Sequence, residues 1–210
     1  MDSCARKGRS TGLNKMFQSA YIKCACGSCG LILVEDKPLC HLACACEDCA
    51  RFMQYLHSSG GGVPVDVVRA YYIRAYILDV FGIDYMGSLK LGSDSETIRT
   101  YCKECFSVLG IYHKLMRDSV FASWPDFCEM SYNLSVPISA YIYVTDPLLY
   151  AELSGEEIPI IGSLYSKSEF KKFIDIEEVA HTFKPTKNVS EAIRFKDLLE
   201  RLGEPKVIVS

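Results

Sequence analysis

Short hydrophobic runs alternate with turn residues between positions 19 and 145 of the chain. The runs are rich in Tyr, Ile and Val and are bounded by Gly, Asp or Ser, which is typical of β-strands. Short strands at this regular spacing favour antiparallel sheets, and the sequence therefore predicts a mainly β fold. The expected strands lie within residues 19–26, 30–35, 69–78, 82–91, 96–102, 107–114 and 139–145.

The last third of the chain has a helical pattern instead. Residues 166–183 predict a helix, and residues 190–203 predict an amphipathic helix with Ser190 as its N-cap and Gly203 just past its end. A short segment at residues 48–57 favours one or two further helical turns. The apolar stripe of the amphipathic helix is expected to pack on the sheet, with a partner protein as the alternative; it consists of Ile193, Leu198, Leu199 and Leu202.

This change of pattern divides the chain into three expected parts. Residues 1–18 are polar and have no periodicity, so we expect a disordered leader there. Residues 19–148 hold the predicted strands and form the main domain. Residues 149–210 form a C-terminal extension whose helices pack on that domain.

Charge and hydropathy narrow the classes of function. A formal net charge of -3 predicts no basic patch for nucleic acid. The chain holds no run of about 18 apolar residues, so no membrane span is expected. Its first residues are charged and lack the apolar core of a secretory signal, which favours a cytoplasmic location.

The cysteine content changes this picture most. The chain has 11 cysteines, and in a reducing compartment so many thiols indicate metal binding or catalysis rather than disulfides. Cysteines two residues apart also fit disulfide geometry poorly. Most of them fall in three clusters, which comprise Cys24, Cys26 and Cys29, then Cys40, Cys44, Cys46 and Cys49, then Cys102 and Cys105.

Two of these clusters together predict a structural zinc site. Cys102 and Cys105 form a C-x-x-C knuckle, whose tight turn aims two sulfurs at one metal ion. Cys24 and Cys26 lie two apart at the end of a predicted strand, where both sulfurs point to one face and Gly27 permits the turn that follows. Four thiolates saturate tetrahedral zinc and would tie two distant segments together.

The remaining cluster predicts a second zinc site with an open position. Cys44, Cys46 and Cys49 supply three sulfurs, and three protein ligands with a free fourth position are typical of a catalytic zinc. A zinc ion of this kind binds a thiolate or polarises a carbonyl oxygen.

Four neighbouring residues have two interpretations each. Cys29 and Cys40 lie close enough to exchange into a zinc site, or they are bystanders. His41 could ligate or orient the second metal, although a histidine on a strand surface is the simpler interpretation. Arg51 follows Cys49 by two residues and either binds an anionic substrate beside the metal or is a solvated arginine at a helix start.

The order of these motifs resembles the family of glutathione-dependent formaldehyde-activating enzymes, which includes centromere protein V. The matching segments are Cys24-Ala-Cys-Gly27, Cys44-Ala-Cys-Glu-Asp-Cys-Ala-Arg51 and Tyr101-Cys-Lys-Glu-Cys-Phe106, within a resemblance that covers about residues 19–148. It implies a β-tent fold, in which small antiparallel sheets are pinned by zinc at the two predicted sites. It also implies addition of glutathione to formaldehyde, which is a carbon–sulfur lyase activity.

The sequence departs from the family pattern at several positions, including a glycine that is displaced to Gly60. Ala45 replaces a histidine, Ala50 replaces the first of two basic residues, and Phe106 stands where the knuckle glycine is usual. The leading hypothesis is a zinc-dependent lyase that acts on a small-molecule thiol such as glutathione. The alternative is a non-catalytic β-tent scaffold that binds a protein partner through its C-terminal helices. A third hypothesis is metal handling or redox sensing by Cys29 and Cys40.

Overall fold

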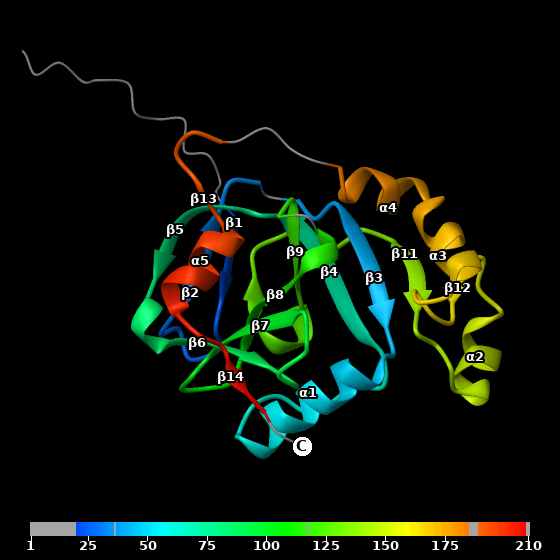
Figure 1. Cartoon of the computed structure of the whole chain (residues 1–210), viewed down its shortest axis with the longest axis horizontal. Coiled ribbons are helices and arrows are strands. Elements are labelled where there is room, and N and C mark those ends of the chain that lie inside the picture. Colours follow the sequence, from blue (N-terminus) through cyan, green and yellow to red (C-terminus); the bar gives the residue numbers. More distant parts are fainter. Residues whose placement is uncertain (1–19, 36, 117, 185–188, 209–210) are drawn as a thin grey trace, which may run out of the picture.

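Two β-sheets form the body of the molecule, with helices at both sides (Figure 1). The computed structural model describes residues 20–35, 37–116, 118–184 and 189–208. The predicted leader at residues 1–18 lies outside them. None of the helices that the structure describes has the length and apolar character needed to cross a membrane.

The smaller sheet has five strands, and each neighbouring pair in it is antiparallel. In spatial order they are β10 (Glu129–Met130), β1 (Ala20–Lys23), β2 (Gly30–Leu33), β5 (Tyr76–Phe81) and β13 (Ile193–Arg194). The hairpin of β1 and β2 brings the first cysteine cluster to the end of this sheet.

The larger sheet has nine strands and is mixed. In spatial order they are β12 (Ile160–Ile161), β11 (Ile138–Ile142), β3 (Cys40–Cys44), β4 (Val68–Arg74), β9 (Val120–Ser123), β8 (Val108–His113), β7 (Thr97–Cys102), β6 (Met86–Lys90) and β14 (Lys206–Val207). β11 runs parallel to both β3 and β12, and β14 runs parallel to β6. The mainly β prediction is confirmed, the purely antiparallel one is wrong for this sheet, and the β-tent fold stays a prediction.

The run at residues 69–78 was expected to be one strand but is divided between the two sheets. The chain turns the corner at Ala75, whose N–H donates to the Ser119 carbonyl while its own carbonyl accepts from the Phe195 N–H. Hydrophobic side chains continue through the corner because both sheets are buried there, so the sequence pattern carries no sign of it.

The sequences of two other strands show no alternation of hydrophobic and polar residues, for a related reason. Every residue of β3 and of β9 is buried, so neither strand has a polar face. Strands that are covered on both sides lack the period of two on which recognition from sequence depends.

The helices differ from their predicted boundaries. The structure has α1 (Glu47–Ser58), α2 (Pro147–Leu153), α3 (Lys167–Ile174), α4 (Glu177–Thr182) and α5 (Phe195–Leu202), with short 3₁₀ turns η1 (Ile83–Tyr85), η2 (Lys114–Met116) and η3 (Pro125–Phe127). α1 is longer than the expected one or two turns. The helix expected at 166–183 is two helices, since α3 ends before Asp175 and α4 begins after Ile176.

The last helix begins later than predicted. Ser190 is not its N-cap, because Ile193 and Arg194 pair with β5 before the helix starts. The Arg194 N–H donates to the Asp197 carboxylate at 2.9 Å, which satisfies one free backbone donor at the helix start. Gly203 follows the last turn with a φ of 77°, as the sequence predicted.

α5 packs on the sheets as expected. Leu198 and Leu199 are buried, and the Phe195 ring stacks on Phe121 with 4.3 Å between ring centroids. Gly110 on β8 makes room for this ring, because a Cβ there would lie 2.4 Å from the Phe195 Cζ. In Figure 1 α5 lies on the side of the five-stranded sheet, and α2, α3 and α4 lie on the opposite side of the molecule.

Candidate metal centres

The first centre begins at the turn that joins β1 to β2. Cys24 and Cys26 lie just past the end of β1, so a turn rather than the strand itself places their sulfurs side by side. The Cys24 N–H donates to the Cys29 carbonyl and the Gly27 N–H donates to the Cys24 carbonyl, both at 3.0 Å. Gly27 has a φ of 78°, a left-handed conformation that glycine adopts without steric cost.

The second half of this centre is the turn between β7 and β8. Cys102 is the last residue of β7, and its carbonyl accepts from the Phe106 N–H at 2.9 Å. The Cys102 N–H donates to the Ser107 carbonyl at the same distance. These bonds close a C-x-x-C turn, so that Cys105 lies beside Cys102 as the spacing predicted.

The structure brings all four of these sulfurs together. The Sγ atoms of Cys24, Cys26, Cys102 and Cys105 all lie within 4.8 Å of one another. Cys26 Sγ is 3.4 Å from Cys24 Sγ and 3.7 Å from Cys102 Sγ. A tetrahedron of sulfurs around zinc at about 2.3 Å has edges of about 3.8 Å, so this donor set fits such an ion.

Burial and local hydrogen bonds differ among these thiols. Burial raises the pKa of the Cys102 thiol to about 12, whereas the hydrogen bond to the Ser28 hydroxyl lowers the pKa of the exposed Cys26. A thiolate at Cys102 is therefore costly unless a cation lies beside it, which is what a bound metal ion provides.

Phe106 occupies the glycine position of the knuckle with a strained backbone. Its φ is 55°, in the left-handed region, and its ring stacks on Tyr101 with centroids 5.9 Å apart. A glycine would adopt this conformation without steric cost. The ring contact offsets part of the conformational cost, which is on the order of 1 kcal/mol for a residue with a Cβ.

A pair of variants tests this conformation. Phe106→Gly and Phe106→Ala both remove the ring, but only glycine also removes the left-handed strain. We expect the glycine variant to have the larger free energy of unfolding, by about 1 kcal/mol. Denaturant unfolding of the two metal-loaded variants measures the difference, and an alanine variant as stable as the glycine variant would contradict a left-handed residue 106.

The second centre joins the end of β3 to the start of α1. Cys44 is the last residue of β3, Cys46 is the N-cap of α1, and Cys49 lies in its first turn. The Cys46 Sγ accepts from the Cys49 N–H at 3.3 Å, and the Cys49 and Cys44 sulfurs are 3.7 Å apart. All three Sγ atoms lie within 4.8 Å of one another, a group that could hold a metal ion.

One thiol of this group ionises most easily. Hydrogen bonds from the Cys44 and Cys49 thiols hold the pKa of Cys46 well below its ordinary value. Hydrogen bonds to other sulfurs of the group raise the pKa values of the Cys44 and Cys49 thiols, and burial raises them further. The helix N-terminus and its free N–H groups favour negative charge at the same place.

The other candidate ligands do not join either group. His41 stacks on Tyr71 with ring centroids 4.2 Å apart, and its Nδ1 lies 3.1 Å from the Val136 carbonyl oxygen. Because side chains alternate along β3, His41 lies on the opposite face from Cys40 and Cys44. His41 therefore lies outside the second group, and it is buried rather than on the strand surface as the simpler interpretation had it.

Cys29 and Cys40 are buried thiols outside both groups. The Cys29 N–H donates to the Cys24 sulfur at 3.3 Å, and the Cys40 thiol donates to the Ser139 hydroxyl at 3.5 Å. Burial raises the pKa of Cys29, and it raises that of Cys40 to about 11. Neither is a reactive thiolate at neutral pH, which argues against redox sensing by these residues.

Arg51 is exposed on α1, and its guanidinium is 3.9 Å from the Asp48 carboxylate. Sequence analysis missed a different arginine, Arg99 on β7, which is only 2% exposed. Its guanidinium carbon lies 5.2 Å from the centre of the Phe52 ring on α1. Residues 97–102 mix polar and apolar side chains on both faces, so alternation gave no sign that Arg99 points inward.

A pocket of about 230 Å³ lies away from both cysteine groups, at the start of β3 and along α4. It is lined by Leu39, Arg74, Glu177, Glu178, His181 and Thr182. None of the seven grouped cysteines lines it.

Comparison with known proteins adds no relative: no family model, no curated protein and no solved structure matches this chain. The likeness to the formaldehyde-activating family therefore rests on the three cysteine motifs and their spacing.

Proposed function

We propose that this chain binds two zinc ions, a structural one in the first centre and one with a free coordination position in the second. The observation that carries the proposal is the convergence of separate segments into one group of four sulfurs and one of three. Four thiolates leave tetrahedral zinc saturated, whereas three leave one position for a ligand from solution. Such thiols stay reduced in the cytoplasm, which is the location we propose.

The reaction we propose is the addition of a thiol, such as glutathione, to formaldehyde, within a β-tent fold. The thiol sulfur attacks the carbonyl carbon, a C–S bond forms, and the thiol proton passes to the carbonyl oxygen. Zinc held by Cys44, Cys46 and Cys49 would lower the pKa of the incoming thiol and so supply its thiolate. Holding the thiol and formaldehyde together at this centre would lower the entropic part of the barrier.

An assay against the uncatalysed reaction tests this activity. We expect the zinc-loaded protein to accelerate the addition of glutathione to formaldehyde, and Cys46→Ser to return the rate to the uncatalysed value. Cys128→Ala serves as the control, because Cys128 is a thiol outside both groups and the variant should keep the wild-type rate. Wild-type protein that adds nothing to the uncatalysed rate would exclude the lyase proposal and favour the scaffold.

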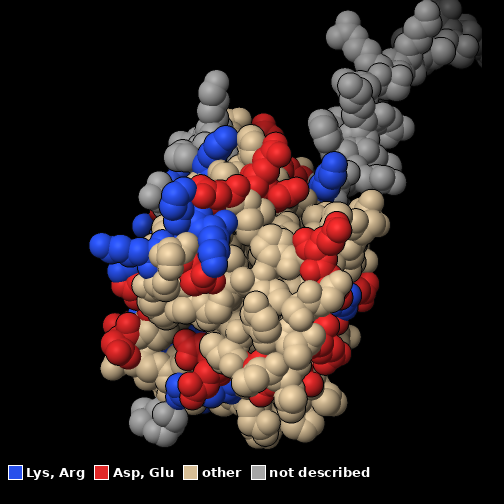
Figure 2. Space-filling model, turned by 90° about the vertical axis from the view of Figure 1, so that its right-hand side faces the viewer, with Lys and Arg blue, Asp and Glu red and all other residues tan. Residues whose placement is uncertain are grey.

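The second candidate, a scaffold for a protein partner, is favoured by apolar side chains exposed on the face that carries α2 and α3. Among them, Leu148 is 83% exposed and Tyr165 is 91% exposed. Tyr150, Phe170 and Ile174 are exposed as well. Figure 2 shows uncharged surface in the middle of this side of the molecule, with most of the visible Lys and Arg at the upper left and Asp and Glu at several places around it. Exposed apolar surface of this kind is typical of protein interaction sites.

A further inference from the structure

Arg99 lies on β7 of the nine-stranded sheet and carries its charge in the protein interior. Its Nε and Nη1 atoms are buried and have no hydrogen-bond partner among the described residues. A guanidinium stays protonated at every physiological pH, so the free-energy cost of burying it cannot be relieved by loss of the proton. An unpaired charge of this kind is strongly destabilising unless an opposite charge lies close to it.

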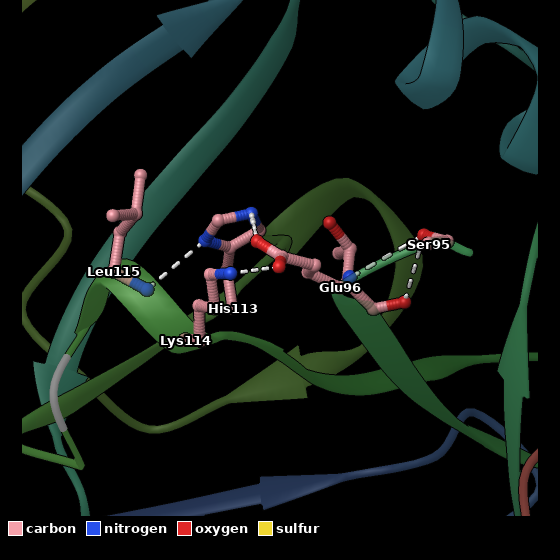
Figure 3. A network of polar contacts seen from close by, with 6 residues as sticks. Ser95, Glu96, His113, Lys114 and Leu115 are labelled. Carbon is pink, nitrogen blue, oxygen red and sulfur yellow. Dashed lines mark hydrogen bonds and ion pairs between the residues drawn. The ribbon is translucent and has the colours of Figure 1, made fainter.

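The acidic side chains near this strand are paired elsewhere. Glu96, three residues before Arg99, forms an ion pair with Lys114 and lies 3.9 Å from His113 Nε2 (Figure 3). Asp48 at the start of α1 is half exposed and lies 3.9 Å from the Arg51 guanidinium. Neither carboxylate forms a hydrogen bond or an ion pair with Arg99 in the part of the chain that the structure describes.

The thiols of the second centre are a further source of negative charge. Cys49 and Phe52 lie one helical turn apart on α1, and therefore on the same face. The Arg99 guanidinium lies over the Phe52 ring, so β7 presents it to that face. Burial lowers the pKa of Arg99. The charge of Cys49 opposes this effect most, followed by those of Asp48, Cys46 and Cys44.

A count of the charges at the second centre indicates the role of Arg99. Three thiolates and one divalent cation leave one negative charge in a poorly solvated place, and one guanidinium balances it. We propose that Arg99 is a positioning residue, the built-in counter-charge that allows Cys44, Cys46 and Cys49 to bind a divalent metal as three thiolates. This inference rests on the proposed second zinc centre.

The first test is the zinc affinity of each centre, measured by competition with a chromophoric chelator. Arg99→Met keeps most of the side-chain volume and removes the charge. We expect it to weaken zinc binding at the second centre by about tenfold or more, as loss of an outer partner of a metal site typically does, and to leave the first centre unchanged. Arg51→Met removes an exposed charge from α1, the helix that carries Cys49. It is expected to leave both zinc affinities unchanged.

A second test separates the charge from simple packing. In a Cys46→Ser background the second centre cannot assemble, so Arg99→Met should then raise the melting temperature, because it removes an unpaired buried charge. A residue needed only for packing would lower the melting temperature in both backgrounds. Arg99→Lys keeps the charge and is expected to retain most of the zinc affinity of the second centre.

The outcomes distinguish the two proposals. If wild-type protein binds two zinc ions and Arg99→Met binds the second as tightly, the counter-charge inference is wrong and the zinc centres stand. If Arg99→Lys loses as much affinity as Arg99→Met, charge is not what Arg99 supplies. If wild-type protein binds only one zinc ion, the proposed second centre itself fails.

Discussion

Serine in place of Cys102 is expected to release the metal of the first centre and to unfold the protein at room temperature. Cys102 is fully buried at the end of β7, and its sulfur is 3.7 Å from that of Cys26. The centre joins the β1–β2 turn to the β7–β8 turn, so a zinc ion bound there would tie together the two sheets. Structural zinc contributes on the order of 10 kcal/mol in small zinc domains, which is comparable to the whole stability of a typical domain.

Circular dichroism and zinc analysis on the same samples measure this effect. The control is Cys128→Ala, which removes a thiol that donates to the Trp124 carbonyl and belongs to neither group. We expect the control to keep its zinc and to lose only about 1 kcal/mol of stability, the worth of an ordinary hydrogen bond. A Cys102→Ser protein that melts within a few degrees of wild type would show that the first centre is not structural.

Each cysteine motif could be recognised from sequence because its own spacing is local. A C-x-x-C turn aims two sulfurs whatever surrounds it, and the three-cysteine motif needs only a strand end and a helix start. The prediction for Cys24 and Cys26 had the right partners, although a turn rather than a strand places them.

Other features depend on contacts distant in the chain and left no local pattern. The corner at Ala75 is made by bonds to Ser119 and Phe195, which are far from it in sequence. β3 and β9 are buried on both faces and do not alternate. Arg99 faces inward because of α1, which packs on β7 from elsewhere in the chain.

The second large effect is expected at Cys46. Cys46→Ser should abolish metal binding at the second centre, because a serine hydroxyl does not replace a thiolate as a zinc ligand and two cysteines remain. The fold should be kept, since the Cys46 sulfur caps α1 by accepting from the Cys49 N–H, and serine is among the best N-cap residues. The substitution is therefore expected to remove one metal site and to leave the protein folded.

Elemental analysis of zinc in purified wild-type and Cys46→Ser protein tests the central claim most directly. Two independent centres predict two zinc ions per wild-type chain and one per Cys46→Ser chain, with matching far-ultraviolet circular dichroism. One zinc ion in both proteins would contradict a metal in the second centre, and with it the proposed thiol chemistry.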